Sequence, residues 1–216
     1  MVRQGKRELP FLFYTSFSFI HLALIRKHIH LQRIQLHMSE NKTKVSQITA
    51  QIIQDLGSDQ ESTVLKAIQK LRTKGTEQVI PVLFKIFATT KSNAIQEAIT
   101  KLVHELKVTS AVEPLIRQLS SPQESCRLLA LSAIWNSGLN VNEYIDEIIQ
   151  SATNGSFMEA FEALTIIENL EPPFEEEVIL NSQLILNQYF NSTTSSERDG
   201  MLKDIAAIIN SVSSTI

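Results

Sequence analysis

Apolar positions follow a helical period along most of this 216-residue chain. The stretch Ser121–Gly138 is the clearest case. It predicts a helix with Ser121 as N-cap, Pro122 at the first helical position, Glu124 closing a capping box, and Gly138 as the stop. Its apolar residues occur on more than one side: Leu128, Leu129, Ala130, Leu131, Ala133, Ile134 and Trp135. A helix that is apolar all round needs several neighbours, so we expect it in the middle of a stack.

The same pattern recurs along the chain. A small residue stands in the middle of each such helix, at Ala67, Ala98, Ala130 and Ala160, and the steps between these four positions are nearly equal. Partner helices between them carry Pro81 and Pro114. Further predicted features are a capping helix over Val45–Leu56, capping boxes at Ser58–Glu61, Ser110–Glu113 and Thr194–Glu197, and helices over Ser156–Leu170, Glu175–Phe190 and Met201–Val212.

A period of about 30 residues made of two antiparallel helices is typical of an α-solenoid, because one pair cannot bury both apolar faces alone. We therefore expect an all-α fold: a right-handed α-α superhelix of about four helix pairs with a capping helix at each end. The expected repeat domain covers residues 38–216.

The residues of this repeat resemble HEAT repeats, in particular the phycobilisome-lyase type. Ser121-Pro122-x-Glu124-x-x-Arg127-x-x-Ala130-x-x-Ala133-Ile134 is similar to that family's first helix, and Ile80–Leu83 and Glu113–Ile116 are similar to its second. The similarity covers roughly residues 58–190. Val64, Ile95 and Phe157 stand where Arg127 stands, so we expect the family's ladder of charges between repeats to be mostly absent. The resemblance also implies that second helices line a concave side.

The amino-acid composition argues against several classes of function. Only 20% of residues are charged and 43% are apolar, as in a globular protein, and one cysteine excludes an internal disulfide framework or a multi-cysteine zinc site. Residues 1–37 hold six basic residues and one acidic residue, and the remainder holds 14 basic and 22 acidic. An acidic body does not suit a nucleic-acid binder. The cysteine usage favours the cytoplasm.

Residues 1–37 differ from the rest. Leu9–Ile25 is apolar and aromatic between basic flanks, which leaves three interpretations open: a signal peptide, a short membrane anchor, or a start codon assigned upstream of the real one at Met38. An anchor at residues 9–25 would make the protein membrane-associated.

No catalytic motif, metal-ligand motif or cofactor motif occurs, so we expect no enzyme, no metal and no cofactor. Cys126 lies on an apolar stripe and is expected to be a buried, inert thiol, and His104 a solvated surface residue. Trp135 is expected mainly to pack on a neighbouring repeat, with a binding role as the alternative.

The leading hypothesis is a non-catalytic scaffold that binds a protein or peptide. A basic-to-acidic ridge along the second helices would orient that partner. Alternatives are a HEAT-like lyase or chaperone-type subunit, or a membrane-tethered scaffold if residues 1–37 are genuine. The candidate binding residues are Lys85, Arg117, Trp135, Glu143, Asp146, Glu147 and Glu177.

Overall fold

The structure, a computed structural model, describes residues 46–74, 77–192 and 196–214. The chain divides into a unit of residues 1–48, of which only 46–48 are described, and a compact unit of residues 49–216. The core and the candidate site belong to the second unit. The predictions for residues 1–37, and the capping box at Thr194, lie outside the described residues. No helix in the described part is long and apolar enough to cross a membrane.

The described residues are helical and contain no β-strand, which confirms the predicted all-α class. A helix over residues 46–56 comes first. It is followed by α2 (Glu61–Lys74), α3 (Ile80–Thr89), α4 (Asn93–His104), α5 (Val112–Ile116), α6 (Glu124–Ser137), α7 (Ile145–Asn154), α8 (Phe157–Glu168), α9 (Glu176–Ser192) and α10 (Asp199–Ser213). Short 3₁₀ turns are η1 (Glu77–Val79), η2 (Thr109–Ala111), η3 (Arg117–Ser120) and η4 (Asn142–Tyr144).

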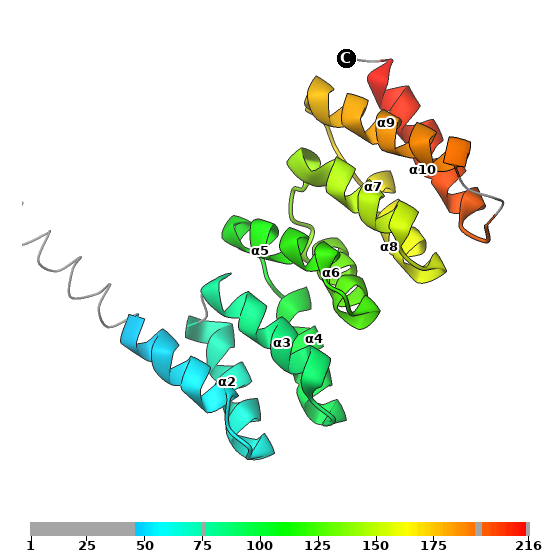
Figure 1. The fold of residues 1–216 in the computed structure, drawn as a ribbon. Helices are drawn as coiled ribbons and strands as arrows, with labels where there is room; N and C mark the ends of the chain where they lie inside the picture. Colours follow the sequence, from blue (N-terminus) through cyan, green and yellow to red (C-terminus); the bar gives the residue numbers. More distant parts are fainter. Residues whose placement is uncertain (1–45, 75–76, 193–195, 215–216) are drawn as a thin grey trace, which may run out of the picture. The chain divides into compact units, whose positions relative to one another are not determined.

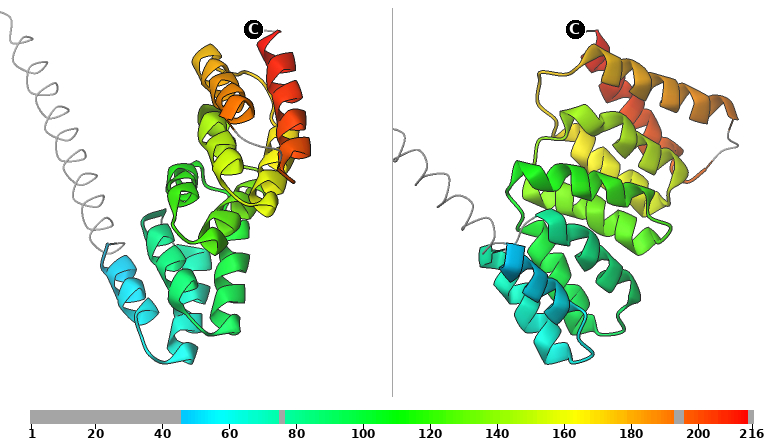
Figure 2. Two further views of the ribbon diagram at one scale, coloured as in Figure 1. Left: turned by 45° about the vertical axis from the view of Figure 1, so that its right-hand side comes forward. Right: turned by 60° about the vertical axis from the view of Figure 1, so that its left-hand side comes forward.

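The helices alternate between two layers (Figure 1, Figure 2). In the first layer α2, α4, α6, α8 and α10 pack in that order, each on the next. In the second layer α3 packs on α5, and α7 packs on both η3 and α9. Each second-layer helix also packs on the first-layer helix that follows it, such as α7 on α8. These contacts join helices that are close along the chain, as in a repeat stack. The right-handed sense of the superhelix stays a prediction.

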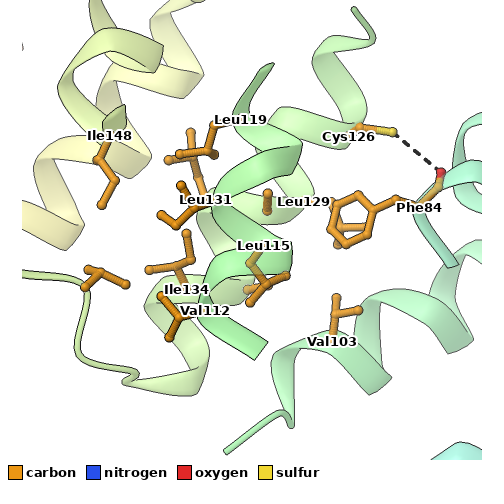
Figure 3. Packing of buried hydrophobic residues seen from close by; sticks show 14 of the residues in the cluster. Phe84, Val103, Val112, Leu115, Leu119, Cys126, Leu129, Leu131, Ile134 and Ile148 are labelled. Carbon is orange, nitrogen blue, oxygen red and sulfur yellow. Dashed lines mark hydrogen bonds between the residues drawn. The ribbon is translucent and has the colours of Figure 1, made fainter. Parts of the chain in front are cut away.

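The core lies between the two layers (Figure 3). Ala67, Ala130 and Ala160 are fully buried, and their lack of bulk lets helices approach closely, as the spacing predicted. Ala98 is only half-buried. The central place of α6 is confirmed, because it packs on α4 and α8 in its own layer and on α3, α5 and η3 in the other. Its buried residues are Cys126, Leu129, Ala130, Leu131, Ala133, Ile134 and Ser137. Two apolar residues of α6 are not buried: Leu128 is half-buried, and 47% of Trp135 is exposed.

Helix ends differ from the predictions. α6 begins at Glu124 with Gln123 as its N-cap, so the capping box expected at Ser121 does not form. Ser121 is extended (φ −62°, ψ 140°), and its hydroxyl accepts a hydrogen bond from the Gln123 backbone instead. Gly138 does end α6, with a left-handed φ of 61° that favours glycine.

Two other predicted capping boxes are also wrong. α5 follows directly from the turn η2, so Ala111 is its N-cap and the Ser110 hydroxyl donates to Glu77. α2 begins at Glu61, and the Ser58 hydroxyl accepts from the Gln60 backbone. In each case the serine lies in a turn before the helix, and its hydroxyl forms a different hydrogen bond there.

Candidate binding cleft

A cleft of about 540 Å³ opens in the second layer, between η3 and α7. We call it the α7 cleft. Its polar lining comes from three places: η3 and the residue after it, the start of α6, and one face of α7. The apolar side chains of Ile116 and Leu119 also line it, and both are buried. The polar and charged side chains in the lining include Arg117, Ser121, Arg127, Glu147, Gln150 and Ser151.

The face of α7 that lines the cleft follows from helical spacing. Glu147, Gln150, Ser151 and Asn154 stand at positions i, i+3, i+4 and i+7, which places them on one side of a helix. The opposite side of α7 carries the fully buried Ile145, Ile148, Ile149 and Ala152. The hydrophobic face thus fixes the rotation of α7 and directs a carboxyl, an amide and a hydroxyl toward η3.

Arg127 joins the cleft to the neighbouring repeat. Its Nε lies 2.6 Å from Oε1 of Glu159 in α8, and its second terminal nitrogen lies 3.1 Å from Oε2, so the pair is bidentate. A third N–H donates to the backbone carbonyl of Ser121, at 2.8 Å. The Arg127 side chain is 22% exposed and that of Glu159 is 0% exposed. The guanidinium has five N–H groups, so two remain without a partner in the described residues.

Glu159 is held from two sides. It also accepts from the Ser156 backbone at 2.8 Å, and the Ser156 hydroxyl accepts from the Glu159 backbone, which completes a capping box for α8. Burial raises the pKa of Glu159, but the hydrogen bonds from Arg127 and the Ser156 backbone outweigh it and hold the pKa below its usual value. Glu159 is therefore ionised and paired.

Gly155 provides the space for this carboxylate. A Cβ at Gly155 would lie 2.5 Å from Cδ of Glu159 and 2.6 Å from the backbone oxygen of Ser151. The backbone at Gly155 is extended, so the requirement is for space rather than for an unusual φ.

Arg198, which directly precedes α10, caps the C-terminal end of α7. It donates to the carbonyls of Thr153 (3.0 Å) and Gly155, and its guanidinium lies 5.6 Å from the centre of the Tyr189 ring. These bonds satisfy carbonyls that the last turn of a helix leaves free. The loop between α7 and α8 is thus held by the side chains of Glu159 in α8 and of Arg198, the residue before α10.

Glu147 stands at the exposed edge of the cleft. Partial burial of its carboxyl, followed by its hydrogen bond with Asp146, raises its pKa to about 7. The usual value is 4.5, so partial burial and the neighbouring Asp146 both disfavour the ionised form of Glu147.

Ser151 has a buried hydroxyl group that forms no hydrogen bond within the described residues. Only 7% of the residue is exposed. A buried hydroxyl of this kind costs about 1–3 kcal/mol relative to a paired one. The oxygen is covered in the free protein, so a ligand in the cleft would remove that cost only after the side chain turned toward the cleft.

The structure brings two predicted site residues together and separates the others. Arg117 and Glu147 both line the α7 cleft. Lys85 lies on α3, Glu143 in η4, Asp146 on α7 and Glu177 on α9, all in the second layer but outside the cleft lining. Trp135 lies on α6, in the first layer, so its assignment to the same ridge was wrong. It lines a different hollow, with Thr165 of α8 and with residues after that helix, including its C-cap Asn169.

The predicted buried thiol is confirmed: Cys126 is 2% exposed, its Sγ lies 3.7 Å from the Phe84 carbonyl (Figure 3), and burial raises its pKa. The prediction for His104 was wrong. It is half-buried, with Nε2 3.0 Å from the Ser132 hydroxyl of α6, and burial lowers its pKa. Neither residue lies in the α7 cleft.

The expectation of a mostly absent charge ladder needs refinement. Val64, Ile95 and Phe157 carry no charge, but Arg127 of α6 pairs with Glu159 in the next repeat. Arg72 of α2 pairs likewise with Glu105, which directly follows α4 in the next repeat, at 2.7 Å. Ion pairs between successive repeats are therefore present at these two steps.

The fold and the cleft together define an all-α protein of stacked helix pairs with a polar cleft in one layer. No protein-family model matches the sequence, and no curated protein matches it either. The resemblance to HEAT repeats consequently stays a prediction that rests on the residues quoted above.

Proposed function

We propose that this protein is a non-catalytic scaffold, built on HEAT-like repeats, that binds a protein or peptide in the α7 cleft. The unpartnered hydroxyl of Ser151, buried in the lining of a polar cleft, is the observation that carries the proposal. Stability alone does not account for this hydroxyl, because an alanine would remove its cost.

The chemistry of the lining supports a peptide as the ligand. Gln150 and Asn154 are exposed side-chain amides, each of which donates and accepts hydrogen bonds. A peptide backbone offers the complementary donors and acceptors along its length. The apolar floor at Ile116 and Leu119 suits the alkyl part of a side chain. A stacked-repeat surface is also an extended one, which suits an elongated partner.

The test is a selection of short synthetic peptides on the purified protein. The library is offered once to the wild-type chain and once to Gln150→Ala/Asn154→Ala, a variant that removes two exposed amides. We expect peptides that bind the wild type and lose affinity on the variant, while Gln69→Ala, an exposed glutamine of α2, changes nothing. Circular dichroism checks that all three proteins keep their helix content. Failure to select any peptide that depends on the amides would overturn the proposal.

A further inference from the structure

We propose that the α7 cleft recognises a carboxylate of its peptide partner, through Arg117, Arg127 and the hydroxyl of Ser151. This inference rests on the proposed function and specifies the group that is bound. The carboxylate is either an aspartate or glutamate side chain or the free carboxyl end of a chain, because both present the same two oxygens.

Donors dominate the lining. The charged residues that line the cleft are Arg117, Arg127 and Glu147. Arg127 keeps two N–H groups uncommitted within the described residues after it has bound Glu159 and Ser121. Because Glu159 holds it in place, its guanidinium is preorganised, so binding loses little side-chain entropy there.

Arg117 is available as well. Its bond to Glu113 is an i,i+4 pair on the surface, with the two side chains 73% and 61% exposed. Pairs of this kind contribute little free energy, so a ligand carboxylate competes with Glu113 at low cost. Two arginines that line the same cleft are suited to a carboxylate, which accepts two hydrogen bonds from a guanidinium fork.

Ser151 adds a third donor. Its oxygen is covered in the free protein, so its hydroxyl donates to a ligand oxygen only once the side chain turns toward the cleft, where a carboxylate is the strongest acceptor that a peptide carries. Glu147 is the one carboxyl among the described residues that line the cleft, and Asp146 stands beside it. When Glu147 is ionised it opposes an anionic ligand, and when it is protonated it does not.

The variants should therefore act in opposite directions. Arg117→Ala should weaken peptide binding about tenfold, equivalent to ~1.4 kcal/mol. Ser151→Ala should also weaken binding, while the stability of the free protein stays the same or rises, a split that a structural serine would not show. Glu147→Gln should bind at least as tightly as the wild type. Arg72→Ala, an arginine in a surface ion pair elsewhere in the stack, is the matched control and should leave affinity unchanged.

The ligand arms use the peptides selected above. Each is resynthesised with every aspartate and glutamate replaced by its amide, and separately with an amidated carboxyl end. Loss of affinity by about tenfold in the first arm identifies a side-chain carboxylate, and in the second arm a chain terminus; either supports the inference. If peptides bind through Gln150 and Asn154 but neither replacement matters, the carboxylate inference is wrong and the peptide-binding proposal stands. If no peptide binds, both are wrong.

Discussion

Replacing Arg127 tests how much the ion pair between Arg127 of α6 and Glu159 of α8 contributes to the free energy of unfolding. In Arg127→Met the alkyl part of the side chain remains, but Glu159, which is 0% exposed, loses its bidentate partner. Breaking a buried pair from one side leaves an uncompensated charge and typically costs about 3–5 kcal/mol. Small domains have only about 5–15 kcal/mol of stability in total, so the loss should be large.

The loss should depend on pH, and the sign follows from Glu159. In the wild type Arg127 keeps the pKa of Glu159 low in spite of burial. Without Arg127, only the bonds from Ser156 still oppose the effect of burial, so we expect the pKa of Glu159 to rise. An acid whose pKa is raised in the folded state destabilises the fold progressively as the pH rises from its unfolded pKa to its folded pKa, and fully above the folded value. The penalty of Arg127→Met should therefore be greatest at pH 8 and should shrink as the pH falls and Glu159 is protonated.

Urea unfolding followed by circular dichroism measures this free energy. The double variant Arg127→Met/Glu159→Gln should recover much of the loss at pH 8, because glutamine keeps the capping bond to Ser156 without a charge. Arg117→Met is the matched control: its pair with Glu113 is exposed, so we expect a change within about 0.5 kcal/mol. A loss below about 1 kcal/mol for Arg127→Met, or a loss that the double variant does not relieve, would refute the reasoning.

Three further substitutions each test one structural feature. Gly155→Ala should lower the free energy of unfolding in urea by about 1–3 kcal/mol, because its Cβ would collide with Glu159 and a backbone oxygen. In the control Gly200→Ala of α10 the added Cβ has nothing within 4 Å, so the change should be neutral or stabilising by up to about 1 kcal/mol, and equal effects of the two variants would contradict the collision at Gly155. Glu147→Gln should raise the melting temperature at pH 8 but not at pH 4, because ionising a carboxyl whose pKa is raised from 4.5 to about 7 destabilises the fold progressively between those values; an equal shift at both pH values counts against it. Trp135→Ala should cost no more than about 2 kcal/mol, since the side chain is half exposed, and a loss of about 4 kcal/mol in the same urea assay would mean that it packs as a core residue.

The helical stack was predictable because burial imposes a period on the sequence. Ala67, Ala130 and Ala160 are small for the same steric reason in each repeat, and they recur where helices approach closely. Gly138 was predictable because a left-handed φ strongly favours glycine. The small residues and the glycine can both be recognised in the sequence without knowing which helices pack against them.

Helix starts were less predictable. A serine three residues before a glutamate occurs at Ser58, Ser110, Ser121 and Ser156, but of these four only Ser156 forms a capping box. The Ser-x-x-Glu pattern indicates which two residues can form the reciprocal hydrogen bonds of a capping box, but it does not indicate at which residue the helix begins. At Ser121 the backbone stays extended and its carbonyl is held by Arg127, so the helix begins later.

The candidate site was predictable only in its charges. Arg117 and Glu147 stand out because charged residues on a second helix face solvent. Ser151 and Gln150 do not stand out, because serine and glutamine are common on helices and nothing local shows that a hydroxyl lacks a partner. That property depends on η3, which belongs to the preceding repeat. The Ser156-x-x-Glu159 pattern was a usable signal for Glu159, but not for its full burial or for its bond to Arg127.

Arg127 links the stability of the stack to the occupancy of the cleft. One edge of its guanidinium binds the buried Glu159, and its side chain also lines the α7 cleft. Val64, Ile95 and Phe157 occupy this position in the other repeats, so the arrangement occurs once among the described repeats. A ligand held by Arg127 binds only the folded α6–α8 contact, and it should stabilise the protein increasingly as its concentration exceeds its dissociation constant. A peptide that binds the cleft should therefore raise the melting temperature of the wild type more than that of Arg127→Met, because the variant has lost both the donors and the partner that holds them in place.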